Sequence, residues 1–99
     1  SLLSDLWEFP TIEKKSKRIS NLKIIDFYFG NKIDIKQKIG TTKHTYSHFK
    51  CEVDLYLCTI NDSIGEIKDM TWIKKSEFSK YAFSKLNHKL FSLIFKSNA

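Results

Sequence analysis

The amino-acid sequence predicts an α+β fold. A strand with a period-two pattern lies in the middle of the chain, helical patterns accompany it, and no regular βαβ alternation is present. The 99 residues fit one domain, residues 1–99, with a modest hydrophobic core. Apolar residues make up 41% and charged residues 28%, which is ordinary for a folded globular chain.

The segment before the central strand is the least distinct. Residues 19–29 fit a helix with Leu22, Ile25 and Phe29 inward, or a strand, because short apolar runs do not separate the two. We prefer the helix. Residues 33–39, in which isoleucines lie among lysines, indicate an edge strand or an extended connection.

The central strand is predicted over residues 49–59. Alternation with polar residues places these apolar side chains on one face: Phe49, Cys51, Val53, Leu55 and Leu57. Residues 61–63, Asn-Asp-Ser, supply turn chemistry. Residues 64–73 are then predicted to return as a second strand that ends near Trp72.

Two helices are predicted after this strand pair. The first is short, over about residues 76–81, and the second begins after Ser84, a favourable N-cap. One stripe of the second helix is apolar and consists of Leu86, Leu90, Leu93 and Ile94. Another stripe carries Lys85, Lys89 and Lys96, so this is predicted to be a surface helix.

Charge is concentrated in the first half of the chain. Residues 1–50 carry ten basic and five acidic groups, whereas residues 51–99 carry seven and six, for a net charge of +6. The first half contains two basic blocks: Lys14, Lys15, Lys17, Arg18 and Lys23, then Lys36, Lys38, Lys43 and Lys50. Such blocks suit a phosphate backbone, although basic surfaces have other causes and an ordinary solvated surface is the alternative.

The sequence also argues against several environments. Its longest apolar runs are a few residues, far fewer than the roughly 20 that span a bilayer, so no membrane partner is expected. On a single strand, Cys51 and Cys58 are separated by about 23 Å and cannot bridge each other. A reduced, cytoplasmic setting is therefore the expectation.

The stretch HTYSHFK, residues 44–50, groups several chemically active side chains without an acid. His44 and His48 have the i, i+4 spacing of helical zinc ligands, but the neighbouring threonines favour an extended backbone, which separates them by about 13 Å. Ser47 beside His48 lacks a nucleophile elbow, and three glycines form no phosphate loop. Neither a catalytic residue nor a metal site is predicted.

Several motifs recur in a familiar order along the chain. They are LWEFP at 6–10, KHTYSHF at 43–49, Trp72-Ile73, SEF at 76–78, YAF at 81–83 and KL at 89–90. In order and spacing, the chain closely resembles the C-terminal domain of MutY-type adenine DNA glycosylases. The resemblance covers almost the whole sequence, and LWEFP together with the serine–histidine loop is a specific combination.

This resemblance implies a Nudix-like mixed β-sheet sandwich with flanking helices. Family domains carry one more strand ahead of the LWEFP leader, so the opening strand is expected to be missing. The implied function is recognition of 8-oxoguanine in an enzyme that removes the adenine mispaired with it. The implied partners are double-stranded DNA with that mispair and the catalytic N-terminal domain of the same chain. An iron–sulfur cluster is implied for that catalytic domain, no cofactor is expected in these residues, and a monomer is expected.

The resemblance also assigns candidate site residues. Tyr46, Ser47 and His48 stand where the family has Phe-Ser-His, so they are the predicted lesion-recognition residues, with buried loop anchors as the alternative for Tyr46 and His48. Because 8-oxoguanine carries a proton on N7, a reader needs an acceptor there, and the Ser47 hydroxyl can supply it. The candidate phosphate-binding residues are Lys14, Lys15, Lys17, Arg18, Lys43 and Lys50.

Two other functions remain as alternatives. A stand-alone Nudix hydrolase needs the signature G-x5-E-x7-R-E-U-x-E-E-x-G-U, whose glutamates hold Mg²⁺. After Pro10 this chain has only Glu13 before Asp26, with a basic block between them that would repel the ion. The other alternative is a protein-interaction module of a repair enzyme.

Overall fold

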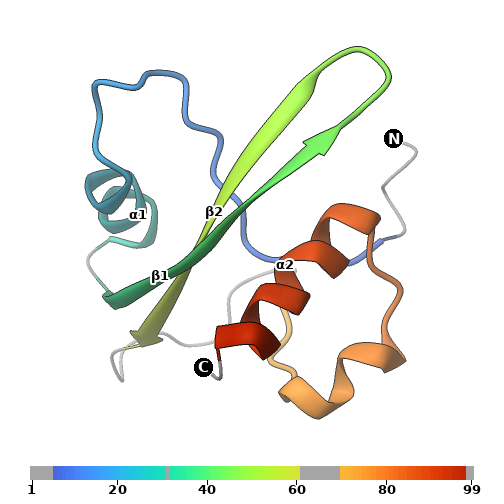
Figure 1. Cartoon of the computed structure of the whole chain (residues 1–99). Coiled ribbons are helices and arrows are strands. Elements are labelled where there is room, and N and C mark those ends of the chain that lie inside the picture. The colour runs from blue at the N-terminus through green and yellow to red at the C-terminus, as the bar shows by residue number, and fades with distance from the viewer. Residues whose placement is uncertain (1–5, 31, 61–69, 98–99) are drawn as a thin grey trace.

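The computed structural model describes residues 6–30, 32–60 and 70–97 (Figure 1). The elements in chain order are α1 (Asn21–Phe29), β1 (Ile33–Thr45), β2 (Lys50–Ile60), the 3₁₀ helix η1 (Lys75–Lys80) and α2 (Lys85–Ser97). Strands and helices therefore occur together without βαβ alternation, which agrees with the predicted α+β class.

A long antiparallel hairpin is the centre of the fold. Ile33 of β1 lies opposite Ile60 of β2, and the pairing runs to Thr45 opposite Lys50. The register shifts twice within the first part of β1, and such irregularities increase the twist of a strand pair. β1 includes the predicted edge strand and extends it to Thr45, while β2 confirms the predicted central strand.

The predicted mixed-sheet sandwich is not confirmed. In the described part of the chain, the sheet has two strands, β1 and β2. The predicted return strand falls mostly on residues 61–69, which lie outside the described residues. Its last part, residues 70–73, has no regular secondary structure, because these residues form a connection toward η1.

Helix α2 packs on one face of the hairpin (Figure 1). Leu90 is 2% exposed, and the other three members of the predicted apolar stripe are half-buried. The close approach occurs at Gly40, where an added Cβ would lie 3.4 Å from both methyl carbons of Leu93. The predicted surface helix is therefore confirmed, with its lysines exposed.

Helix α1 covers part of the other face. Ser20 caps it by accepting a hydrogen bond from the Lys23 amide, and Gly30 ends it with a left-handed φ of 61°. The side-chain Nδ2 of Asn21 donates to Asp54 Oδ2 (2.9 Å) and to the Tyr56 hydroxyl (3.0 Å), and these bonds connect the helix to β2. The preferred helix is confirmed, but the prediction that Leu22 points inward is wrong, because polar contacts at Asn21 attach this helix and leave Leu22 half exposed.

Because α2 and α1 cover opposite faces of the hairpin, the burial of β2 differs from the prediction. Its central apolar residues are half-buried as expected, but Phe49 and Leu57 are exposed. Asp54, Tyr56 and Cys58, predicted to lie on the polar face, are half-buried on the α1 side. The single apolar face is therefore correct for the middle of the strand and wrong at Phe49 and Leu57.

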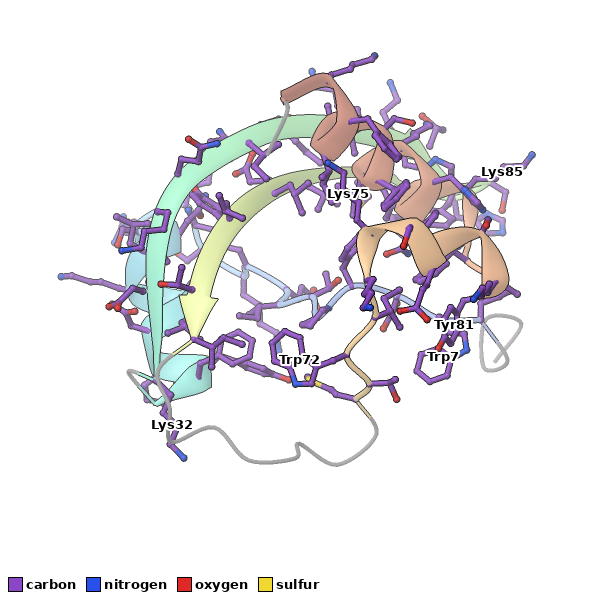
Figure 2. All side chains as sticks on the ribbon, turned by 90° about the horizontal axis from the view of Figure 1, so that it is seen from below. Trp7, Lys32, Trp72, Lys75, Tyr81 and Lys85 are labelled. Atoms are coloured by element: carbon purple, nitrogen blue, oxygen red, sulfur yellow. The ribbon has the colours of Figure 1, made fainter. Side chains whose placement is uncertain are left out.

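An aromatic core joins the N-terminal leader to η1 and α2. Phe78 is 6% exposed and stacks on Phe91 (centroids 3.7 Å apart) and Phe83 (4.1 Å). The Trp7 amide donates to Ala82 O (2.8 Å), and Figure 2 shows Trp7 beside Tyr81. The leader therefore packs against the aromatic core, where large aromatic side chains bury much apolar area.

The buried side-chain amide of Asn87 connects the N-terminal leader to α2. Asn87 is 5% exposed, and its Oδ1 accepts a hydrogen bond from the Phe9 amide (2.9 Å). Its Nδ2 donates to Ser84 Oγ (2.8 Å), so both ends of the side chain are satisfied.

Across the described ranges, none of the helices has the length and apolar character needed to cross a bilayer.

Candidate nucleic-acid interface

The tip of the β1–β2 hairpin carries the predicted recognition residues. The Tyr46 amide donates a hydrogen bond to Phe49 O (2.8 Å), which closes the hairpin and leaves Ser47 and His48 at its end. Both of these side chains are exposed, whereas Tyr46 is half-buried. Figure 1 shows the tip projecting away from α1 and beyond α2. The hydroxyl and the imidazole are therefore accessible to a large ligand.

Three rings support the tip from below. Tyr46 stacks on Phe49, with centroids 4.8 Å apart and planes 28° apart. His44 meets Tyr46 edge-on, with centroids 4.7 Å apart and planes at 77°. These contacts fix the base of the turn, because aromatic pairs in stacked and edge-on arrangements attract each other beyond simple burial. Tyr46 therefore packs between His44 and Phe49 at the base of the turn.

Helix α2 braces this set of rings through one lysine. The Lys89 ammonium lies 3.0 Å from His44 Nδ1 and donates to Lys43 O at 3.1 Å. An ammonium has only donors, so His44 Nδ1 accepts and the neutral imidazole carries its proton on Nε2. The contact links α2, through His44 and Tyr46, to the turn.

Basic side chains flank the tip on both strands. Thr45 pairs with Lys50 and Lys43 pairs with Glu52, so Lys43 and Lys50 lie just below the turn. Lys43 Nζ is 4.0 Å from Glu52 Oε2, and both side chains are largely exposed, so this ion pair contributes little. Both lysines are therefore available to an anion beside Ser47.

The other predicted phosphate ligands lie elsewhere. Lys14, Lys15, Lys17 and Arg18 are exposed on the segment ahead of α1, and Lys14 Nζ donates to Asn21 Oδ1 (2.8 Å) at the first turn of that helix. The structure thus gathers two basic regions, one at the hairpin tip and one around α1. It does not bring the six predicted lysine and arginine residues into one patch.

Asp54 organises the polar contact between α1 and the hairpin. Its carboxylate accepts from Thr41 Oγ1 (2.6 Å) and lies 3.2 Å from Lys38 Nζ, in addition to its contact with Asn21. The hydrogen bond from Thr41 lowers the pKa of Asp54 below its ordinary value; Lys38 and Asn21 add to this, and burial opposes it. Asp54 is therefore held as a carboxylate, and its position supports α1.

Neither cysteine nor histidine pairs indicate a metal centre. Cys51 and Cys58 are both free and half-buried, and burial raises the pKa of the Cys58 thiol, with Asp26 adding to the effect. Among the residues that the structure describes, no three His, Cys, Asp or Glu side chains gather as a metal ion would require.

Comparison with known proteins places the chain in a family. A model of the NUDIX domain matches residues 1–93 of the 99. The chain belongs to the NUDIX domain family. No curated protein and no solved structure matches it.

The fold of this NUDIX domain also shows residues that sequence reasoning missed. Lys89 was expected only as part of a solvated stripe, and Asn87 was not singled out, although each makes contacts that position a distant segment. Phe49 was expected on the buried face of a strand and is 60% exposed beside the turn. No local pattern marks these roles, because their partners lie about 40 to 80 residues away along the chain or depend on where the hairpin ends.

Proposed function

We propose that this NUDIX domain recognises 8-oxoguanine in duplex DNA as part of an adenine DNA glycosylase. The observation that carries the proposal is the placement of Ser47 and His48, exposed at the end of a braced hairpin with a lysine on each flanking strand. A two-stranded β-ribbon fits the major groove of DNA, where guanine and 8-oxoguanine present different hydrogen-bonding groups. The resemblance to the MutY-type C-terminal domain, which implies this role for Tyr46, Ser47 and His48, also supports the proposal.

The chemistry follows from one proton. Guanine presents an acceptor at N7, whereas 8-oxoguanine presents an N–H donor there. The Ser47 hydroxyl can accept from that donor, and the same hydroxyl can rotate to donate to undamaged guanine. A single rotor therefore discriminates less than the about 1–3 kcal/mol of a good bidentate contact. His48, next along the turn, can donate to a neighbouring phosphate.

The flanking lysines provide affinity without sequence information. Lys43 and Lys50 lie on the two strands that lead into the turn, in position to contact the phosphates on either side of a base that Ser47 touches. Such contacts release counterions, so binding should weaken as salt is raised. Recognition and affinity would then reside in different side chains of the same hairpin.

The side chains of α1 argue against nucleotide hydrolysis by this domain. Helix α1 ends at Gly30, and the hydrolase signature also carries a glycine near its end. When the signature is aligned on Gly30, its last three glutamates fall on Ile24, Phe27 and Tyr28. None of these side chains can bind Mg²⁺ as a carboxylate does. The NUDIX scaffold is therefore proposed to serve binding rather than pyrophosphate release.

The test compares two duplexes that differ only at the lesion. Anisotropy measurements would give the affinity of the 99-residue chain for DNA with adenine opposite 8-oxoguanine and for DNA with adenine opposite guanine. We expect the damaged duplex to bind several-fold tighter, and Ser47→Ala to bring the ratio close to one. The matched control is Ser79→Ala, an exposed serine of η1, which should leave the ratio unchanged.

Two results would count against the proposal. Equal affinity of the unmodified chain for both duplexes would remove lesion recognition. A lesion preference that Ser47→Ala leaves intact would remove the hairpin tip as its source. Magnesium-dependent release of pyrophosphate from 8-oxo-dGTP would instead favour the hydrolase alternative.

A further inference from the structure

Helix α1 presents an unusual amount of apolar surface to solvent. Phe27 is 91% exposed and Tyr28 is 56% exposed. Ile19 and Leu22, just before them, are about half exposed, and no residue of α1 is buried. Contact of this much apolar surface with water is unfavourable, so a ligand that covers it gains affinity.

The same region is strongly basic. Residues 14–32 contain one acid, Asp26, and six basic residues, which are Lys14, Lys15, Lys17, Arg18, Lys23 and Lys32. The hydrogen bond from Lys14 Nζ to Asn21 Oδ1 (2.8 Å) folds the basic segment back onto the first turn of α1. Lys23 lies one turn before Phe27 on the same side of the helix, and Figure 2 shows Lys32 projecting near the end of α1.

The distribution of these side chains separates the classes of ligand. At about 100° per residue, Leu22 and Phe27 lie roughly 140° apart, and Tyr28 lies another 100° around the helix. A helix that sinks into a lipid surface keeps its apolar residues on one face, which α1 does not do. Exposed rings on different sides of a helix, with basic residues before and after it, instead suit a ligand with separate flat bases on a phosphate chain.

We propose that α1 and the basic segment before it bind an unpaired DNA strand. Phe27 and Tyr28 stack on bases, and Lys14, Lys23 and Lys32 contact the phosphates. The charge complementarity is with the ligand backbone, since this stretch has a surplus of five positive charges (six basic residues minus one acidic). The choice of DNA over RNA rests on the proposed function, but the binding itself needs no lesion and no duplex.

The test uses a fluorescein-labelled thymidine 20-mer and the 99-residue chain at low salt. Phe27→Ala should weaken binding by about 5- to 150-fold if one base stacks on this ring. The control is Phe95→Ala, a 56% exposed phenylalanine on α2, which should leave the affinity unchanged. Lys23→Gln should flatten the slope of log affinity against log salt by about 0.7. Because Phe27 is so exposed, its replacement should not alter the circular dichroism spectrum.

The outcomes distinguish this proposal from lesion recognition. An affinity for the 20-mer that is unchanged in both Phe27→Ala and Tyr28→Ala would overturn it. It would also be overturned if these variants lost binding to anionic phospholipid vesicles but kept binding to the 20-mer. The 20-mer contains no purine, so Ser47→Ala should leave its binding intact. If the chain shows no lesion preference but Phe27→Ala still loses the 20-mer, the proposed function fails and this inference stands.

Discussion

Lys89 of α2 donates a hydrogen bond to Nδ1 of His44 on β1, at 3.0 Å. The same ammonium donates to Lys43 O, so one side chain holds two consecutive residues just below the turn. His44 then packs edge-on against Tyr46, whose amide closes the hairpin. The orientation of the tip is thereby set by a helix that belongs to the hydrophobic core.

Replacement of Lys89 should loosen the tip with little loss of stability. Lys89→Met keeps the apolar stem and removes the donors, so exchange of the Tyr46 amide with deuterium should accelerate by about 2- to 10-fold. The free energy of unfolding should fall by about 1 kcal/mol or less, because the contact is exposed. Lys89→Arg should retain part of the protection, and Lys96→Met on the same helix should have no effect on Tyr46.

The brace also fixes the tautomer of His44. Nitrogen NMR shifts should show Nδ1 as an unprotonated acceptor and Nε2 as the protonated nitrogen, because the ammonium can only donate. Detection of the Nδ1–H tautomer at neutral pH would contradict the hydrogen bond.

The aromatic core should account for much of the stability. Phe78→Ala removes a ring that is 6% exposed and stacks on three others, so we expect a loss of about 3–5 kcal/mol in the free energy of unfolding. Phe95→Ala deletes an equal side chain that is 56% exposed and whose ring contacts include Lys75 and Phe91, and it should cost about 1 kcal/mol. Urea unfolding followed by circular dichroism measures both, and equal losses would contradict this account of the core.

Asp54 should make the α1 contact sensitive to acid. Because its pKa is lowered in the folded protein, the folded state binds a proton less readily than the unfolded state. Its contribution is therefore fully present at neutral pH and is lost below about pH 4, as the pH falls through the folded pKa. Asp54→Asn should reduce stability at pH 7 by about 1–2 kcal/mol and flatten the acid limb. Glu52 is an exposed carboxylate on the same strand. Its replacement in Glu52→Gln should change the free energy of unfolding by no more than about 0.5 kcal/mol, at pH 7 or in acid.

Local sequence patterns predicted the elements with strong periodicity. The apolar stripe of α2 agrees with the structure, whereas the alternation along β2 agrees in the middle of the strand and is wrong at Phe49 and Leu57. Helix α1 was predicted with Leu22 inward, yet it is attached through Asn21 and Tyr56 and leaves Leu22 half exposed. Polar attachment of this kind leaves no periodic signal.

The candidate site was predicted in part. The motif residues Tyr46, Ser47 and His48 lie in the turn of the hairpin, whereas Lys14 of the basic block contacts α1. The contact between Lys89 and His44 spans 45 residues, and its donor is one of several lysines on the helix surface. Only the three-dimensional register of α2 on β1 distinguishes it from the others.

Leu90 and Lys89 are neighbours on α2, and they link the stability of the core to the position of the hairpin tip. Leu90 is 2% exposed in the core, and the side chain before it supports the hairpin tip. Any molecule that binds only the ordered tip must therefore raise the melting temperature of the whole domain, by an amount set by its concentration and dissociation constant. A simple thermal-shift screen of oligonucleotides should accordingly report their binding, even for a compound without a fluorescent label.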